Sequence, residues 1–397
     1  MLDKLSVADL DLKSQLLFIR VDFNVPLDKD ANITDDTRIR AALPTIKYAL
    51  EHKGRVVLAS HLGRPKGKVV KEMSLLPVAR RLESLLDVKV LFAKDCIGPE
   101  VNTIKSRLED GEIVLLENLR FHQEETGNDP GFCEALATGM ERYVNDAFGT
   151  AHRAHASTVG ITSFFDVSAA GFLIEKEIRY LGNAVSDPER PLTAILGGAK
   201  ISGKIDVIQN FLPRVDNLLI GGGMTYTFFR AQGFEIGDSL LEEEKISLAA
   251  DILKEAEAQK VNLVLPFDTV IADKIDPGAQ TRVITGKEIP PGWAGVDIGP
   301  ETIKKYAGYV KNSGTIVCNG PMGIFEMTPF ARGTLEITQA LAESSGTTIV
   351  GGGDSVAAVR QAGLVDRITH VSTGGGASLD FLAGKVLPAI EVLTDKK

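Results

Sequence analysis

The sequence predicts an α/β fold made of two Rossmann-like, three-layer α/β/α domains that have parallel sheets and are joined by an interdomain helix. Three observations lead to this prediction. Short apolar, β-branched runs alternate with helix-like stretches along nearly the whole chain, an order typical of parallel sheets with crossover helices. The runs are almost continuously apolar, as expected of strands that are covered on both faces. A charged stretch interrupts the alternation near the middle of the chain.

The apolar runs fall into two series, one in each half of the chain. The first half contains five, at Leu16–Asn24, Arg55–His61, Val88–Ala93, Glu112–Asn118 and Tyr143–Phe148. The second half contains six, in the segments LTAILGG, NLLIGGG, NLVLPF, TIVCNGP, TTIVGGGD and THVSTGGG. Because ligands of such sheets bind beyond the carboxyl ends of the strands, the residues that follow each run are the informative ones.

The segment between the two series predicts a helix that links two domains. Four apolar residues fall near one helical face, and the sequence DPERP then ends the pattern: Phe172, Ile174, Ile178 and Leu181. The expected organisation is an N-terminal domain at 1–171, an interdomain helix and hinge at 172–185, a C-terminal domain at 186–380, and a C-terminal segment at 381–397 that packs back on the N-terminal domain. A surface helix within one large domain is the alternative.

Composition and charge limit the classes of partner. A net charge of -9 argues against nucleic acid and against an anionic membrane surface, so an anionic ligand needs a local basic cluster. No apolar run approaches 18 residues and the N-terminus is charged throughout, which predicts a cytoplasmic protein. Three widely separated cysteines, Cys96, Cys133 and Cys318, favour buried thiols over a disulfide framework or a structural zinc site.

The first series of strands ends in charged and hydrogen-bonding residues. Five basic residues lie at or beyond these ends: Arg38, His61, Arg64, Arg120 and Arg153. Arginines in several such loops suit a small ligand with phosphate and carboxylate groups, because the guanidinium pairs bidentately and stays charged. Each arginine taken singly also fits a solvated surface. Asp22 and Asn24 fit hydroxyl binding and turn capping equally well, and the histidines of HRAH favour a core or supporting position over a metal site.

The second series ends almost entirely in glycine. The segment IVGGGDSVAAV runs through Gly351–Gly353 into a helix near Asp354 and Ser355, which directs backbone N–H groups at an anion. Asp354 would repel a bare phosphate but suits Mg²⁺ carried on a nucleotide. A second triple glycine follows at Gly374–Gly376, and CNGPMGIFE places Asn319 and Glu326 at another strand end. Glycine also occurs in ordinary helix caps and turns, so no single glycine loop is specific. The prediction of a nucleotide site rests on the occurrence of several such loops at successive strand ends.

The stretch LTAILGGAKISGK superficially matches a P-loop. Gly198, Gly203 and Lys204 have the G-x-x-x-x-G-K spacing, but Ile205 stands where a P-loop has Ser or Thr and cannot bind Mg²⁺. Lys200 and Lys204 are four residues apart, so a helix that starts just after Gly198 would place both on one face as a paired-lysine clamp. A dinucleotide fingerprint is absent, which argues against a dehydrogenase.

Together these motifs resemble the phosphoglycerate kinase family. The following segments occur in that family's order from residue 20 to residue 378: RVDFNVP, ALPTI, SHLGRP, LENLRF, NDAFGTAHRAHAS, ILGGAK, NGPMGIFE, GGGDS and STGGGAS. The resemblance implies a monomeric, two-domain glycolytic enzyme. Its reaction would be reversible Mg²⁺-dependent phosphoryl transfer between 1,3-bisphosphoglycerate and ADP, giving 3-phosphoglycerate and ATP.

The resemblance also implies roles for individual residues. The 3-phosphoglycerate site would contain Asp22, Phe23, Asn24, Arg38, His61, Leu62, Gly63, Arg64, Arg120 and Arg153. The nucleotide site would contain Gly198, Lys200, Lys204, Gly295, Asn319, Glu326, Gly352, Gly353, Asp354 and Ser355, with Asp354 as the metal ligand. Arg38, Lys200 and Gly375 would be catalytic, and the register to ALPTI selects Arg38 over Arg40.

The predicted chemistry needs no general base. The acceptor carboxylate of 3-phosphoglycerate is already ionised at pH 7, because an unperturbed carboxyl titrates near ~4. Direct in-line transfer without a phosphoenzyme then requires only positioning and charge neutralisation. With the two substrates on different halves, we expect the halves to close over them and exclude water.

Overall fold

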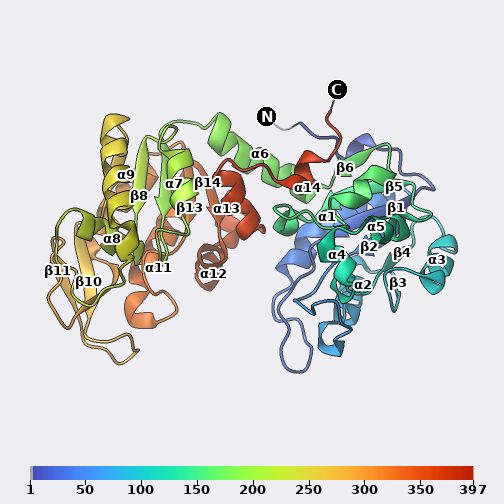
Figure 1. The fold of residues 1–397 in the computed structure, drawn as a ribbon, viewed down its shortest axis with the longest axis horizontal. Helices are drawn as coiled ribbons and strands as arrows, with labels where there is room; N and C mark the ends of the chain where they lie inside the picture. Colours follow the sequence, from blue (N-terminus) through green and yellow to red (C-terminus); the bar gives the residue numbers. More distant parts are fainter. Residues whose placement is uncertain (1–2, 397) are drawn as a thin grey trace. The chain divides into compact units, whose positions relative to one another are not determined.

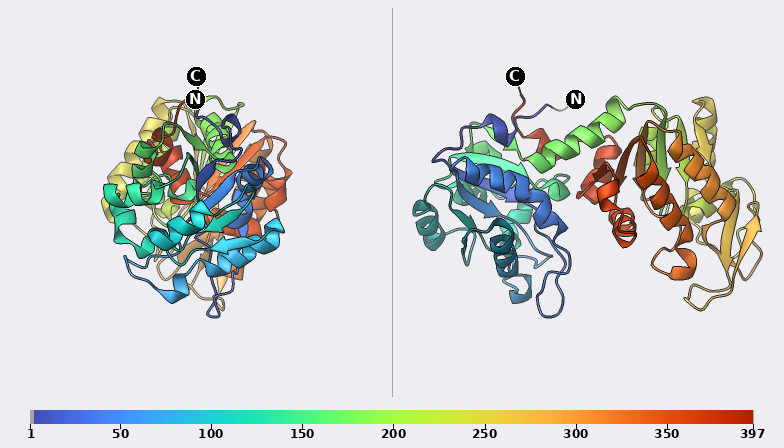
Figure 2. Two further views of the ribbon diagram at one scale, coloured as in Figure 1. Left: turned by 90° about the vertical axis from the view of Figure 1, so that its right-hand side faces the viewer. Right: turned by 180° about the vertical axis from the view of Figure 1, so that it is seen from behind.

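The computed structural model describes residues 3–396, which form two compact units. One unit runs to Arg179 and also includes the chain from Val386 onward, and the other is Tyr180–Lys385. Each unit has a six-stranded sheet with helices packed on both faces (Figure 1, Figure 2). The predicted fold class is confirmed.

The sheet of the first unit is entirely parallel, in the order β3-β4-β2-β1-β5-β6. Its strands are β1 Leu16–Val21, β2 Arg55–Ala59, β3 Val90–Phe92, β4 Ile113–Leu115, β5 Arg142–Asp146 and β6 Ser168–Ala170. Strand β1 is buried along its whole length, as expected of a central strand covered on both faces. All five strands predicted for this half are present. Strand β6 was not predicted, since the sequence Ser-Ala-Ala has no β-branched residue.

The helices of this unit pack an apolar face on the sheet. They are α1 Thr37–Glu51, α2 Leu76–Leu86, α3 Pro99–Ser106, α4 Gln123–Gly127, α5 Pro130–Ala137 and α14 Pro388–Glu391. Proline in the first turn begins α2, α3 and α5, where the missing N–H costs no hydrogen bond. From α1, Ile39 and Ile46 enter the same core as Leu17 and Ile19 of β1.

The last residues of the described chain lie beside its first residues within this unit (Figure 1). The N–H of Leu5 donates to the carbonyl of Thr394 at 2.8 Å, and the N–H of Thr394 donates to Ser168 at 2.9 Å. Ala389 likewise donates to the carbonyl of Ala151 at 3.1 Å. The C-terminal segment therefore completes the first unit rather than the second.

The sheet of the second unit is also parallel, in the order β15-β14-β13-β7-β8-β9. Its strands are β7 Leu192–Leu196, β8 Asn217–Ile220, β9 Asn262–Val264, β13 Thr315–Asn319, β14 Thr347–Gly351 and β15 His370–Val371. Its helices are α7 Ile205–Phe211, α8 Met224–Ala231, α9 Ile246–Ala258, α10 Pro300–Lys311, α11 Arg332–Glu343, α12 Gly353–Gln361 and α13 Gly376–Leu382. All six strands lie in the predicted segments.

A three-stranded antiparallel sheet in this unit was not predicted. Its order is β11-β10-β12, with β10 Asp268–Ala272, β11 Thr281–Thr285 and β12 Ala294–Ile298. Strand β11 is largely exposed, so it lacks the apolar run by which the other strands were recognised. Strand β12 places Gly295 opposite Ile271 of β10.

Helix α6, Phe172–Ser186, contains the point at which the chain divides into the two units, between Arg179 and Tyr180; the interdomain helix and hinge at 172–185 stays a prediction. Its first turn is held in the first unit by Asp146, whose Oδ1 accepts the N–H of Leu173 at 2.8 Å. Burial raises the pKa of Asp146 to about 7. All three cysteines are buried thiols, as predicted. Among the described residues, none of the helices is both long enough and apolar enough to cross a membrane.

Candidate functional site

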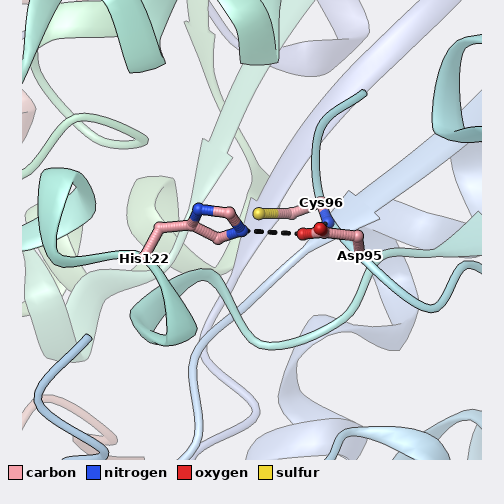
Figure 3. A group of neighbouring side chains, drawn as sticks. All are labelled: Asp95, Cys96 and His122. Atoms are coloured by element: carbon pink, nitrogen blue, oxygen red, sulfur yellow. Dashed lines mark hydrogen bonds and ion pairs between the residues drawn. The ribbon is translucent and has the colours of Figure 1, made fainter. Parts of the chain in front are cut away.

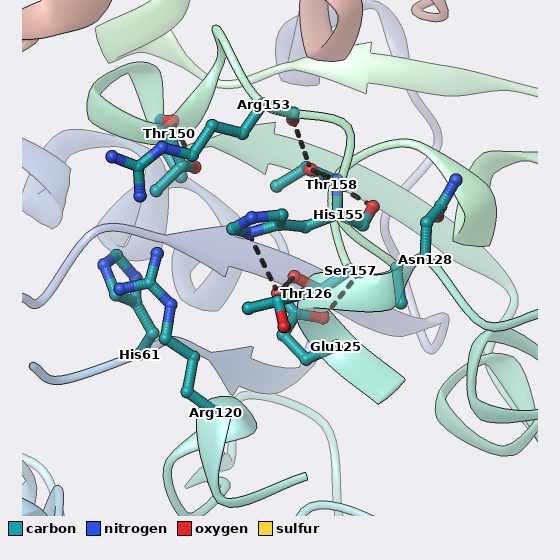
Figure 4. A network of polar contacts seen from close by, with 12 residues as sticks. His61, Arg120, Glu125, Thr126, Asn128, Thr150, Arg153, His155, Ser157 and Thr158 are labelled. Atoms are coloured by element: carbon teal, nitrogen blue, oxygen red, sulfur yellow. Dashed lines mark hydrogen bonds and ion pairs between the residues drawn. The ribbon is translucent and has the colours of Figure 1, made fainter. Parts of the chain in front are cut away.

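The carboxyl ends of the first sheet bring a group of basic side chains together. Figure 4 shows four of them around a common space: His61, Arg120, Arg153 and His155. They arrive on the loops after β2 and β5 and on the 3-10 turn Leu119–Phe121 after β4. Parallel strands end at one edge of a sheet, which is why residues so distant in the sequence converge here.

Arg38, from the first turn of α1, is held by the loop after β1. Its Nη1 donates to Asp22 Oδ2 and to the carbonyl of Asn24, each at 3.1 Å. The Asn24 side chain in turn accepts the N–H of Gly63 at 2.8 Å. Asp22 and Asn24 thus position Arg38 and the loop that contains Gly63, which is a capping and supporting role. The side chain of Phe23 is fully buried.

His61 is buried and fixed as one tautomer. Arg20, at the end of β1, places Nη2 3.1 Å from His61 Nδ1. Since arginine only donates, Nδ1 must accept, and the ring proton lies on Nε2. Burial and the charges of Arg20, Arg120 and Arg38 hold the pKa of His61 well below its usual value. His61 is therefore a neutral hydrogen-bond donor.

Arg120 is nearly buried but only partly paired. Its Nη1 donates to the carbonyl of Gly63 at 2.8 Å, while Nε and Nη2 are buried and find no hydrogen-bond partner among residues 3–396. Burial and the charges of Arg20 and Arg153 lower the pKa of Arg120 to about 10. A buried charged group with unmet donors is costly, so this side chain is set up for an anionic ligand.

The other predicted residues of this half are less constrained. Arg64 is exposed, and the backbone N–H of Leu62 is taken by the Asn118 side chain at 3.2 Å. Gly63 has a φ of +63° and its missing Cβ would lie 2.9 Å from Met73 Sδ. Arg153 is half-buried, and its Nε donates to His152 Nε2 at 3.1 Å.

A buried network behind the cluster was missed by sequence reasoning. Glu125 accepts the Ser157 N–H at 2.9 Å and the Ser157 hydroxyl at 2.7 Å, and Arg20 Nε donates to the same hydroxyl at 2.8 Å. His155 Nδ1 lies 3.9 Å from Glu125 Oε1 (Figure 4). One signal was available, because Arg20 interrupts an otherwise apolar strand.

The second unit contains a cavity of about 440 Å³ at the carboxyl end of its sheet. Four predicted nucleotide residues line it: Gly198, Gly295, Glu326 and Asp354. Tyr226, Leu240 and Ile324 add an apolar wall that was not predicted. A Cβ on Gly295 would lie 2.2 Å from the ring of Tyr226, so glycine keeps this wall flat. The shape and the mixed lining suit a small organic ligand with an apolar part.

The paired-lysine helix is wrong as predicted. Helix α7 begins at Ile205 with Lys204 as its N-cap, and Lys200 lies in the irregular segment before the turn at 202–204. Glu242 accepts the N–H of Ser202 at 3.1 Å, which stabilises this turn against continuation of the helix. Ile208 is buried as expected, whereas Ile205 is only partly so.

Lys204 instead reaches the end of β13. Its Nζ donates to Asn319 Oδ1, and burial lowers the pKa of Lys204 to about 8. Asn319 Nδ2 is buried without a hydrogen-bond partner within residues 3–396. The Lys204 ammonium group and the side-chain amide of Asn319 therefore lie together at the end of β13.

The start of α12 presents a carboxylate beside glycine backbone. Gly352, with φ +89°, is the N-cap, and Asp354 lies in the first turn and lines the cavity. Ser355 is buried and its hydroxyl accepts the N–H of Gly320. A single hard oxygen ligand next to open cavity space fits Mg²⁺, which usually takes one or two carboxylates together with phosphates. Gly375, with φ +50°, precedes α13.

Comparison with known proteins gives one consistent result. A family model described as phosphoglycerate kinase matches residues 7–385. The chain is 54% identical over 397 residues to the phosphoglycerate kinase of Chlorobaculum tepidum, covering 99% of this chain and 100% of that protein. It is similar to the solved phosphoglycerate kinase structures from Coxiella burnetii (41% identity, TM-score 0.90) and Pyrococcus horikoshii OT3 (34%, TM-score 0.84), each covering 98% of both chains.

Proposed function

Since the chain belongs to the phosphoglycerate kinase family, whose glycolytic reaction transfers a phosphoryl group between 1,3-bisphosphoglycerate and ADP, we propose how its residues divide that work. The first unit holds 3-phosphoglycerate, and the second holds the nucleotide. The observation that carries this division is Arg120, a buried guanidinium whose Nε and Nη2 have no hydrogen-bond partner in the described part of the chain. It supports an anionic ligand at the edge of the first sheet.

In the first unit, each group has a distinct task. Arg120, Arg153 and the exposed Arg64 bind the phosphate, and neutral His61 donates from Nε2. Asp22 and Asn24 hold Arg38 in place, and Asp22 can also accept a substrate hydroxyl. The neutral state of His61 matters, because its proton is then available without adding a further charge to a crowded cluster.

In the second unit, the apolar wall of the cavity takes the base and the glycine loops take the phosphates. Lys200, Lys204 and Asn319 supply donors to the phosphate oxygens, while Glu326 accepts ribose hydroxyls. Gly352, Gly353 and Ser355 contribute backbone N–H groups. Mg²⁺ on Asp354 would neutralise phosphate charge when the nucleotide is bound.

Electrostatic stabilisation of the transition state is the main catalytic contribution that we assign to the protein in the transfer step. The carboxylate attacks in line, and Arg38 and Lys200, with N–H groups near Gly375, stabilise the charge on the migrating phosphoryl group. Because the two substrates are assigned to different units, the units must close over them and exclude water for each turnover. A monomeric state and a cytoplasmic location stay predictions.

Arg38→Ala tests the proposal, with Arg40→Ala as the matched control. Arg40 is exposed, and within residues 3–396 its ion pair is with Asp36, at 2.9 Å. Loss of one contact to a developing charge typically lowers kcat by about 10²- to 10³-fold. We expect that loss for Arg38→Ala, an unchanged MgATP affinity, and near-normal turnover for Arg40→Ala.

The assay supplies 3-phosphoglycerate and MgATP, couples the product to glyceraldehyde-3-phosphate dehydrogenase, and follows the loss of NADH. Near-normal kcat in Arg38→Ala would remove Arg38 from the mechanism. Equal losses in both arginine variants would show that general charge, rather than this position, carries the effect.

A further inference from the structure

Three side chains of types that bind metals converge in the first unit, and none of them is among the residues assigned to substrate. Asp95 and Cys96 lie in the loop after β3, and His122 follows the turn Leu119–Phe121. One ligand atom from each lies within 4.8 Å of the other two, and His122 Nε2 is 2.7 Å from Asp95 Oδ1. Figure 3 shows the thiol, the imidazole and the carboxylate pointing toward one another.

The burial of the three groups differs in a way that suits a metal site. Cys96 is fully buried, whereas the side chains of His122 and Asp95 are 27% and 55% exposed. The sulfur therefore lies at the base of the group and the carboxylate at its solvent-facing side. A cation can enter from that side, and water can supply a further ligand there.

Backbone contacts hold both segments in place. The N–H of Cys96 donates to Asp95 Oδ1 at 2.7 Å, and the N–H of His122 donates to the carbonyl of Leu119 at 3.2 Å. The His122 ring packs against Phe132, with centroids 5.2 Å apart. Preformed ligands need little ordering when a cation binds.

We propose that Asp95, Cys96 and His122 bind Zn²⁺ or a cation of similar softness. Thiolate and imidazole select Zn²⁺ over Mg²⁺ and Ca²⁺, which prefer oxygen ligands. Three protein ligands with water in the fourth position is a common zinc arrangement. On binding, the Cys96 thiol loses its proton to solvent and forms the S–Zn bond. His122 Nε2, which donates to the Asp95 carboxylate in the free protein, releases that proton to solvent while Nδ1 takes one up, so that the Nε2 lone pair faces the cation.

A hydrogen bond between His122 and Asp95 is an alternative explanation for the closeness of these two side chains. That alternative does not account for the Cys96 thiol beside them, whereas a metal site does. The geometry places that sulfur with the other two ligand atoms, all within 4.8 Å of one another. Such a site has no Cys-x-x-Cys spacing, which is why the cysteine pattern argued against structural zinc.

Cobalt replaces zinc as a spectroscopic probe in the experiment. Full-length protein, treated with chelator and kept reduced, is titrated with Co²⁺. A sulfur-to-cobalt charge-transfer band that saturates near one equivalent, and that Zn²⁺ abolishes by displacement, is the expected result. Cys96→Ser should remove the band, whereas Cys133→Ser, which alters another buried thiol, should retain it.

Substitutions at the two partly exposed ligands provide a second test in case the substitution at buried Cys96 disturbs folding. Disturbing even the outer partners of a metal ligand typically costs about 10- to 100-fold in affinity, so His122→Asn and Asp95→Asn should weaken Co²⁺ binding by at least about 10-fold. Circular dichroism checks that each variant is folded. The proposal is overturned by absence of the band, by its survival in Cys96→Ser, or by unchanged affinity in His122→Asn.

Discussion

His155 is expected to make the folded state sensitive to acid. It is buried and faces Arg120, Arg20 and Arg153, and burial followed by these charges lowers its pKa from 6.5 to about 4. The carboxylate of Glu125, 3.9 Å away, opposes that effect but is outweighed. His155 therefore stays neutral in the folded protein at pH values where the unfolded chain would already be protonated.

The direction and the size of the stability change follow from proton linkage. Between pH 6.5 and 4 the unfolded state binds more protons at this residue than the folded state, so stability falls as the pH falls. One pKa unit corresponds to 1.36 kcal/mol, and the change from 6.5 to about 4 gives roughly 3 kcal/mol lost by His155 across this range. Above pH 6.5 the contribution is complete.

The assay compares wild type with His155→Asn in urea unfolding followed by circular dichroism at several pH values from 7.5 to ~4. Phosphate and sulfate are left out, because they would bind the basic cluster. As the pH falls, we expect the free energy of unfolding to decline less steeply in His155→Asn than in wild type. The difference between the two proteins should therefore shrink by about 3 kcal/mol over this pH range. His52→Asn, at an exposed position, should run parallel to wild type. Parallel curves for His155→Asn would refute the reasoning.

Three further predictions concern single residues. Gly295→Ala puts a Cβ 2.2 Å from the Tyr226 ring. The KM for ATP should therefore rise by at least about 10-fold, while the KM for 3-phosphoglycerate stays unchanged. Equal rises in the two KM values would contradict a local effect. Arg120→Lys removes the planar fork that pairs with phosphate, and steady-state kinetics should show a rise of roughly 10-fold in KM for 3-phosphoglycerate alone, about 1.4 kcal/mol. Asp354→Asn should raise the Mg²⁺ concentration needed for half-maximal rate without changing the melting temperature; an unaltered Mg²⁺ dependence would exclude this carboxylate as the ligand.

The strands that could be predicted are those whose burial on both faces forces a continuous apolar run. All eleven predicted strands are present. Most of them are buried along nearly their whole length, whereas β3 and β9 are only partly buried. Strand β6 and the antiparallel sheet escaped, because β6 is short and built from small residues and β11 faces solvent. Their positions depend on pairing with a neighbour rather than on their own composition.

The loops at strand ends were predictable in kind, but the contacts within them were not. Charged residues after strands indicated the basic cluster, whereas the partner of each side chain depends on register between distant strands. Lys204 shows the limit, since the spacing to Lys200 fitted a helix. The turn that replaces the helix depends on Glu242, about 40 residues later in the chain.

The balance of charge behind the cluster explains why Arg20 belongs to the site although it lies inside a strand. Arg20 is fully buried, and a buried cation needs compensation. Ser157 links it to Glu125 through hydrogen bonds of 2.8 and 2.7 Å, and that network compensates this one arginine. Arg120, in contrast, keeps two nitrogen atoms that no group within residues 3–396 accepts from. The fold thus satisfies the arginine that orients His61 and leaves hydrogen-bond donors of Arg120 open, so an anionic substrate at this edge of the sheet would supply the acceptors that Arg120 lacks.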